Sequence, residues 1–202
     1  MEIAQLLGTV IFAVSGVVAV AERRLDWFGV LVVATVTAVG GGTLRGLILG
    51  DVPVFWIEDN KYIFTALAGG ILAIPLVRRF GRDHEEFENG LVLLDAMGLS
   101  LFAITGAQVT LDLGLDGATA VICGILTGVG GGVIRDLLAG QQPLILRSDI
   151  YATAALVGTG LYVVLVDSLS VAQAPAMAIG MLLIFLLRMV AYRRGWSLPP
   201  LK

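Results

Sequence analysis

Two segments of the chain share a pattern that is unfavourable inside an apolar helix. GGGTLRGLILGDVP occupies residues 40–53, and GGGVIRDLLAGQQP occupies residues 130–143, ninety residues later. A glycine in a helix interior costs about 1 kcal/mol relative to alanine. An arginine at the centre of a membrane helix costs roughly 2.5–3.5 kcal/mol on insertion scales. The chain carries the glycine triplet and the following arginine twice, at the same spacing. This repetition predicts two related helices with a shared role.

The segments around these motifs are long and apolar. Hydrophobic residues make up 57% of the 202 residues and charged residues 14%, whereas soluble domains hold roughly 25% charged residues. A membrane-spanning helix needs about 20 mainly apolar residues. We therefore expect an all-α membrane protein with seven transmembrane helices, whose longest connectors are 50–61, 80–89 and 140–150. The predicted spans are 3–21, 27–49, 62–79, 90–110, 117–139, 151–167 and 173–192.

Lysine and arginine are unevenly divided between the two alternating sets of connectors. Cytoplasmic loops of membrane proteins carry an excess of these two residues. We therefore predict that the N-terminus lies outside and the C-terminus in the cytoplasm. One set of connectors holds only Lys61, and the other set with the C-terminal tail holds Arg23, Arg24, Arg78, Arg79, Arg82, Arg147, Arg193, Arg194 and Lys202.

The ninety-residue register extends well beyond the two motifs. Because each aligned unit holds three spans, the second unit enters the membrane from the opposite side, an inverted topology typical of transporters with a site at the repeat interface. We interpret residues 1–82 as one three-helix repeat, 90–167 as a second, inverted repeat, and 173–202 as a seventh helix with a short cytoplasmic tail. The aligned pairs include FAVSG (12–16) with FAITG (102–106), Asp26 with Asp116, Thr37 with Thr127, and, one gap later, Tyr62 with Tyr151.

The glycine triplets predict an interruption of the second and fifth spans. Each helix would break at its triplet, 40–42 or 130–132, into a longer and a shorter segment. Backbone carbonyls that are freed beside a cavity are suitable ligands for K⁺ or Na⁺. The alternative is that the glycines only allow close helix crossing. On the first interpretation, the pore is lined by Gly40, Gly41, Gly42, Gly130, Gly131 and Gly132, with the hydroxyls of Ser15, Thr37, Thr105 and Thr127.

Arg45 and Arg135 follow the two triplets at the same distance, each a few residues before the end of its span, and the inverted topology puts them on opposite membrane sides. Each could extend its charge to the nearest interface, but this does not explain why both take the same place relative to the glycines. The alternative is that both face a shared cavity. Asp95, inside LVLLDAMGLS, is then the candidate partner, and its counterpart in the first repeat is Gln5. Asp136 follows Arg135 directly and is expected to point elsewhere on the helix. We hypothesise that Arg45, Arg135, Asp136 and Asp95 form a gate or counter-charge set.

The chain lacks the residues for most catalytic and metal sites. It has one cysteine and one histidine, so neither a nucleophile–histidine pair with an orienting partner nor a Cys/His metal site can be assembled. We expect no enzyme activity and no cofactor, with K⁺ or Na⁺ as a permeant ion only. A net charge of −3 gives no sign of a nucleic-acid partner.

At these residues the sequence resembles the trimeric intracellular cation (TRIC) channels, specifically the prokaryotic members that are also described as a bacterial inner-membrane family with two "glycine transporter" domains. The resemblance rests on FAxSG/FAxTG, the paired GGGxxR motifs and the glycine–proline turn after each, and it covers nearly the whole chain. It implies two inverted three-helix bundles plus a seventh helix, with kinked helices 2 and 5. It also implies a homotrimer in the lipid bilayer with one pore per subunit, which conducts monovalent cations, K⁺ foremost and also Na⁺.

Two other functions compete with this one. Animal members of the family carry a lysine motif where this chain has Arg135-Asp136. This difference argues against animal-type gating and favours a location in the plasma membrane of a prokaryote. An inverted repeat also fits a secondary transporter of a small zwitterion such as glycine, because helix ends can hold a carboxylate and an ammonium. A structural membrane protein is the third alternative, in which the glycines serve packing alone.

Overall fold

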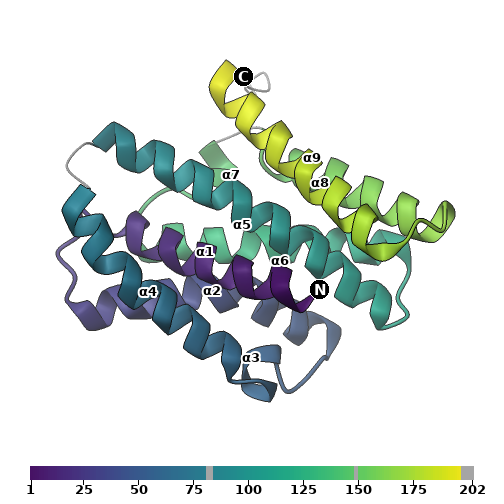
Figure 1. The fold of residues 1–202 in the computed structure, drawn as a ribbon, viewed down its shortest axis with the longest axis horizontal. Helices are drawn as coiled ribbons and strands as arrows, with labels where there is room; N and C mark the ends of the chain where they lie inside the picture. The colour runs from purple at the N-terminus through teal and green to yellow at the C-terminus, as the bar shows by residue number, and fades with distance from the viewer. Residues whose placement is uncertain (81–83, 148–149, 197–202) are drawn as a thin grey trace.

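Helices make up almost all of the computed structural model, which describes residues 1–80, 84–147 and 150–196 (Figure 1). No strand occurs within these ranges, so the all-α class is confirmed. The long helices are α1 (Glu2–Ala19), α2 (Trp27–Leu49), α4 (Lys61–Phe80), α5 (His84–Asp112), α6 (Gly117–Leu138) and α9 (Gln173–Arg194). The shorter helices are α3 (Phe55–Glu58), α7 (Leu144–Arg147) and α8 (Ala152–Val163), and α8 continues as a π-helical turn over Val164–Ser168.

Six helices within the described ranges are long and apolar enough to cross a membrane: α1, α2, α4, α5, α6 and α9. The remaining predicted span, 151–167, corresponds to the shorter apolar helix α8 and its π-helical extension. The predicted positions of the spans therefore agree with the structure, while the total of seven crossings stays a prediction.

The predicted connectors are more helical than expected. Residues 80–89 were expected to form a loop, but α5 already begins at His84, so this prediction is wrong over most of its length. The residues that follow His84 are mainly glutamate and other residues compatible with a helix, which extend α5 beyond its apolar part. Each of the other two long connectors contains a one-turn helix, α3 or α7.

Four helices form the centre of the bundle: α1, α2, α5 and α6. Helix α4 packs on α1 and α2, and helices α8 and α9 pack on α5, as Figure 1 shows. The last helix thus lies against the second half of the chain rather than between the halves. Three clusters of buried apolar side chains fill the spaces between these helices.

Equivalent aspartates begin the two central helices that carry the glycine triplets. Asp26 accepts a hydrogen bond from the backbone N–H of Gly29 at 2.7 Å, and Asp116 accepts one from Thr119 at 3.0 Å. Side-chain oxygens at this position satisfy the free N–H groups of the first helical turn. The hydrogen bonds from the hydroxyl and the N–H of Thr119 lower the pKa of Asp116 below its usual value. The repeat therefore encodes where α2 and α6 begin.

Helices α2 and α6 cross at the two triplets. A Cβ atom at Gly41 would collide with the carbonyl oxygen of Thr127, and one at Gly131 would lie 2.5 Å from the carbonyl oxygen of Thr37. Both helices continue through their triplets without interruption, so the predicted break into two segments is wrong. Gly41 and Gly131 face the backbone of the other helix, while Gly42 faces the ring of Phe55. A bend of the helix axis at the triplets stays a prediction.

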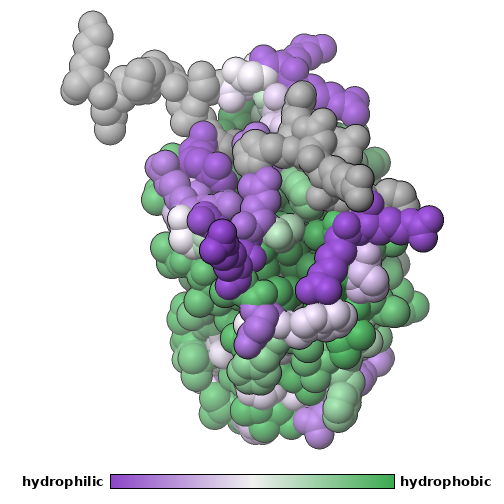
Figure 2. All heavy atoms as spheres, turned by 90° about the vertical axis from the view of Figure 1, so that its left-hand side faces the viewer, coloured by the Kyte–Doolittle hydropathy of each residue, from purple (hydrophilic) through white to green (hydrophobic). Residues whose placement is uncertain are grey.

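One end of the bundle carries most of the exposed positive charge. At this end α1 and α4 finish and α2 and α5 begin, and Figure 2 shows hydrophilic side chains gathered over it above a largely hydrophobic surface. Arg23, Arg24, Arg78 and Arg79 are exposed there. The guanidinium of Arg78 lies 4.8 Å from the ring centre of Trp27. Predicted cations at positions 82 and 202 lie outside the described residues.

Gly41→Ala tests the close crossing of α2 and α6. The added methyl group would press on a backbone carbonyl of α6, and overpacking of this kind costs typically about 1–3 kcal/mol. We expect a lower thermal unfolding midpoint for the detergent-solubilised protein. Gly160→Ala is the matched control, because a Cβ there meets nothing within 4 Å. That variant should keep or slightly raise the midpoint, and equal midpoints for the two variants would contradict the tight crossing.

Candidate functional site

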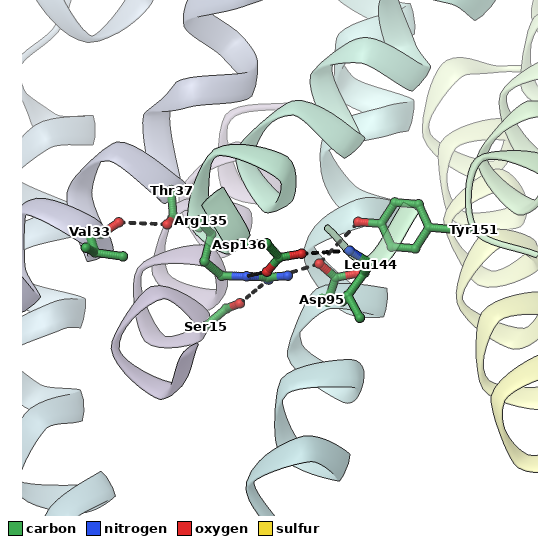
Figure 3. A network of polar contacts seen from close by, with 8 residues as sticks. All are labelled: Ser15, Val33, Thr37, Asp95, Arg135, Asp136, Leu144 and Tyr151. Carbon is green, nitrogen blue, oxygen red and sulfur yellow. Dashed lines mark hydrogen bonds and ion pairs between the residues drawn. The ribbon is translucent and has the colours of Figure 1, made fainter. Parts of the chain in front are cut away.

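Arg135 lies at the centre of a buried polar network (Figure 3). Its Nε donates to Oδ1 of Asp136 at 2.8 Å, and its Nη1 donates to Oδ1 of Asp95 at 3.0 Å and to Oγ of Ser15 at 2.6 Å. All four side chains are fully buried, since none exposes more than a trace of its surface. Helix α6 supplies the arginine, and α1 and α5 supply partners from both halves of the chain. The network therefore joins the two halves.

Further groups hold the two carboxylates in place. The hydroxyl of Tyr151 donates to Oδ1 of Asp95 at 3.1 Å, and the backbone N–H of Leu144 donates to Oδ2 of Asp136 at 2.8 Å. The guanidinium of Arg188 lies 4.6 Å from the ring centre of Tyr151 and donates to the carbonyl of Ile150. Helix α9 thus supports the network from behind the tyrosine.

The expectation that Asp136 points away from Arg135 is wrong. Consecutive side chains on a helix leave the axis in different directions, but the arginine side chain is long enough to bend back and present its Nε to the neighbouring carboxylate. The other oxygen of Asp136 faces the chain that follows α6, where it accepts from Leu144. Asp136 therefore fixes both the guanidinium and the entry into α7.

The network carries a formal net charge of −1, because two carboxylates surround one guanidinium. Buried charges of opposite sign are tolerated only when the geometry is good and the remaining polar atoms are paired. Two atoms are not: Oδ2 of Asp95 and Nη2 of Arg135 are buried without a hydrogen-bond partner. The network therefore keeps one acceptor and one donor nitrogen unpaired in the interior.

Arg45 has a different environment in the first half. It is 5% exposed, its Nε has no hydrogen-bond partner, and no ion pair to it occurs among the described residues. Beside it is a cavity of about 10 Å³. The cavity is lined by Gln5, Gly42, Arg45, Phe55, Phe102, Thr105 and Thr127.

The predicted hydroxyl residues are all buried, but they are not all at one place. Thr105 and Thr127 line the cavity next to Arg45, and Ser15 binds Arg135. Thr37 donates to the carbonyl of Val33 in its own helix (Figure 3). It also packs against Gly16. Thr105 and Thr127 likewise donate to carbonyls one turn earlier. Their role as the lining of a single ion route stays a prediction.

A wider pocket of about 310 Å³ opens at the end of the bundle that carries the exposed arginines. Its lining includes Leu91 and Val92, one turn before Asp95, and Leu144, whose N–H binds Asp136. The Arg135 network therefore lies next to the inner part of this pocket. Within the described residues, no three His, Cys, Asp or Glu side chains are grouped to hold a metal ion.

Three residues of the site were not predicted: Tyr62, Tyr151 and Arg188. The first two were aligned by the internal repeat, and each donates its hydroxyl to an equivalent position, Gln5 at 2.8 Å and Asp95 at 3.1 Å. The alignment of the two tyrosines by the internal repeat could therefore have indicated both as residues of the site. An arginine inside the apolar run of the last helix was another, because charges within such helices are rare and usually functional.

Comparisons with known proteins place this architecture. A family model described as "Glycine transporter" matches residues 2–78 and 92–167. The Escherichia coli (strain K12) UPF0126 inner membrane protein YadS is 41% identical over 194 residues, which are 96% of this chain and 92% of the relative. A UPF0126 membrane protein of Deinococcus radiodurans is 42% identical over 196 residues, 96% of this chain and 88% of the relative.

Solved structures agree with these matches. The TRIC channel orthologue from Rhodobacter sphaeroides superposes with a TM-score of 0.90 at 36% identity, covering 96% of this chain and 98% of that one. The chain belongs to the TRIC family. A second structure, from work on conductance through TRIC cation channels, gives a TM-score of 0.86 at 35% identity over 100% of this chain and 97% of that one. A TRIC counter-ion channel at 16% identity and a TM-score of 0.59 shares the fold.

Family membership confirms the resemblance drawn from the paired motifs. With several apolar helices of membrane-spanning length and relatives named as inner membrane proteins, this TRIC-family chain is a multi-pass bacterial inner membrane protein. The network around Arg135 and the cavity beside Arg45 lie on the two sides of the glycine crossing. They are the two candidate functional positions in its interior.

Asp95→Asn tests the charge balance of the network. Removing one partner of a buried ion pair costs about 3–5 kcal/mol, and we expect the lower end because Asp136 remains beside Arg135. The thermal unfolding midpoint should fall clearly. In the double variant Asp95→Asn with Arg135→Gln, the loss should be smaller than the sum of the single losses, because the contact between the two side chains can be lost only once. Additive losses would show that the two side chains do not interact.

Proposed function

We propose that the chain is a monovalent cation channel that conducts K⁺ foremost and also Na⁺, with one pore in each subunit of a homotrimer. The observation that carries the proposal is a series of buried polar groups along the bundle, from the wide pocket through the Arg135 network to the cavity beside Arg45. The likeness to TRIC cation channels over the whole chain supports the same function.

The charge of the Arg135 network is compatible with a cation route. A single arginine beside such a route would repel K⁺, but two carboxylates give the cluster a formal charge of −1. The unpartnered Oδ2 of Asp95 offers a direct oxygen ligand. A partly dehydrated cation needs oxygen ligands of this kind along its path. In this proposal Arg135 orients the carboxylates and prevents their mutual repulsion.

The glycine triplets form the narrowest part of the proposed pore. Gly41 and Gly131 place the backbones of α2 and α6 in direct contact. A Cβ at Gly132 would lie 3.0 Å from Oδ1 of Asp95 and 3.1 Å from the hydroxyl of Tyr151. Conduction therefore requires α2 and α6 to separate or bend at the triplets, which glycine permits. Carbonyl oxygens of Gly40–Gly42 and Gly130–Gly132 would then face the ion.

We propose Arg45 as the gating charge. Arg135 is held by three hydrogen bonds to side chains, whereas Arg45 forms none with the part of the chain that the structure describes. A side chain without partners can move at lower energy than one in a paired network. Its positive charge in the small cavity would oppose a cation until it moves or is neutralised.

The remaining features follow from the same proposal. The cluster of exposed arginines at one end of the bundle supports a cytoplasmic location for that end and, with it, the proposal that the N-terminus lies outside. The two matched segments of the family model, 2–78 and 92–167, support a division into two inverted repeats followed by α9. No step of this function is enzymatic.

Transport of a small zwitterion is the second candidate. It is favoured by two unpartnered polar atoms, Nε of Arg45 and Oδ2 of Asp95, which could bind a carboxylate and an ammonium group. The two atoms lie on different sides of the glycine crossing, so one small molecule would meet them in turn rather than together. This arrangement is less suited to a carrier site than to successive positions of an ion route.

Reconstitution into planar bilayers separates the two candidates. A channel should give unitary K⁺ currents that reverse with the K⁺ gradient and persist with Na⁺. A carrier should give saturable glycine uptake into proteoliposomes without unitary currents. Protein-free membranes are the control for leak. Uptake without currents would overturn the channel proposal, and neither signal would favour a purely structural role.

Arg45→Ala tests the proposed gating charge. Removing a positive charge from the pore should raise the K⁺ current or its open probability and change its dependence on voltage. Arg24→Gln removes an equal charge from an exposed position at the end of the bundle and should leave the single-channel properties close to those of the parent. If Arg45→Ala conducts like the parent at every voltage, Arg45 is not a gate.

A further inference from the structure

The two halves of the chain meet in mirrored contacts. The rings of Phe12 and Phe102, which the ninety-residue register aligns, lie 5.2 Å apart. A Cβ at Gly16 would touch Oγ1 of Thr37, and a Cβ at the aligned Gly106 would touch Oγ1 of Thr127. Each half therefore contains the same helix contacts. Where the two halves carry different polar residues at aligned positions, the chemistry therefore differs while the surrounding helix contacts are alike.

The surroundings of the two arginines differ in this way. Tyr151 donates to Asp95 in the second half, and Tyr62 donates to Gln5, the position aligned with Asp95, in the first half. Asp136, which follows Arg135, is aligned with Gly46, which follows Arg45. Both carboxylates of the Arg135 network are thus absent around Arg45. Asp51 attracts Arg45 from a distance, but the two form no ion pair.

Arg45 is consequently a buried cation that forms no ion pair among the described residues. Arginine keeps its proton in proteins, so the side chain cannot become neutral as a lysine could. A buried charge is expensive unless it is paired and hydrogen-bonded. The neighbouring cavity of about 10 Å³ can hold roughly one water-sized group. Water in that cavity would form hydrogen bonds but supply no negative charge.

The walls of the cavity are mostly apolar, and two polar side chains around it, Arg45 and Gln5, can donate hydrogen bonds. The guanidinium of Arg45 has only donors. The side-chain oxygen of Gln5 already accepts from Tyr62 at 2.8 Å, which leaves its amide NH₂ as the group that can face the cavity. Donor groups beside an unpaired positive charge recognise anions.

We propose that this cavity binds one small monovalent anionic group, either chloride or the carboxylate of a small zwitterion. The anion takes the place that Asp95 and Asp136 occupy around Arg135. Small movements of Arg45 and Gln5 enlarge the cavity for the ion. The binding site stands independently of the proposed channel. Its effect on conduction rests on that function: a bound anion neutralises Arg45 and lowers the barrier to K⁺.

Thermal unfolding in detergent tests binding without any transport assay. Chloride replaces gluconate in steps at constant ionic strength, so surface screening stays the same. An anion that binds only the folded state stabilises it by RT ln(1 + [L]/Kd). The unfolding midpoint of the parent should rise and then saturate with chloride.

Three variants identify the site. Arg45→Gln should lose the chloride-dependent shift, and Gln5→Glu should lose it as well, because its carboxylate supplies an internal counter-charge and still accepts from Tyr62. Gln5→Glu should also match the parent's chloride-bound midpoint in gluconate alone. Arg24→Gln should keep the shift. No shift in the parent, or equal shifts in the parent, Arg45→Gln and Gln5→Glu, would overturn the proposal.

Two further measurements distinguish chloride from a carboxylate as the bound group, and the anion site from the channel function. Glycine titrated in gluconate shifts the midpoint if the site takes a carboxylate, and chloride alone shifts it if the site takes a halide. If neither glycine nor chloride shifts the midpoint, the proposed site is overturned. In bilayers, replacing chloride by gluconate should lower K⁺ open probability in the parent but not in Gln5→Glu. A chloride-dependent midpoint without any current would retain the site and overturn the channel. Chloride-independent current without a midpoint shift would retain the channel and overturn the site.

Discussion

The direct contact between the backbones of α2 and α6 is the constraint on which the rest of the interior depends. Gly41 and Gly131 allow this contact, because no side chain stands between the two helices. As a result Arg135, one turn beyond its triplet, reaches Ser15 of α1 and Asp95 of α5 at 2.6 and 3.0 Å. A side chain at the crossing would separate the helices and withdraw the guanidinium from both partners. The glycines therefore determine the geometry of the charged cluster as well as the packing.

Charge in this interior is balanced locally rather than by solvent. Arg135 is enclosed by two carboxylates, and Arg188 is placed over the ring of Tyr151 and binds a backbone carbonyl. Each of these cations meets a fixed partner of its own. Arg45 is the exception among the three buried arginines that the structure describes, since no fixed partner is supplied within its half. Ionisable residues inside a membrane protein are rare and usually functional, which makes this exception the strongest candidate for a functional charge.

Much of the fold could be predicted from the sequence, because long apolar segments and a ninety-residue register are properties of the chain alone. The positions of the spans, the family and the burial of Asp95 beside Arg135 followed from them. The helical continuity through the triplets could not be predicted, since it depends on what the glycines face. The contact of Arg135 with Asp136 depends on the bend of a long side chain. Helix α9 lies outside the repeat, so no aligned position indicated that Arg188 supports Tyr151.

The presence of both halves on a single chain has an evolutionary consequence. Two identical three-helix subunits assembled as a symmetric dimer would be obliged to place the same side chain at both equivalent positions. A mutation from glutamine to aspartate would then change both at once. In a single chain the two aligned positions can mutate separately, so one can be acidic, as at Asp95, and the other neutral, as at Gln5. A single chain can therefore hold unlike side chains on the two sides of one crossing, which two identical subunits could not.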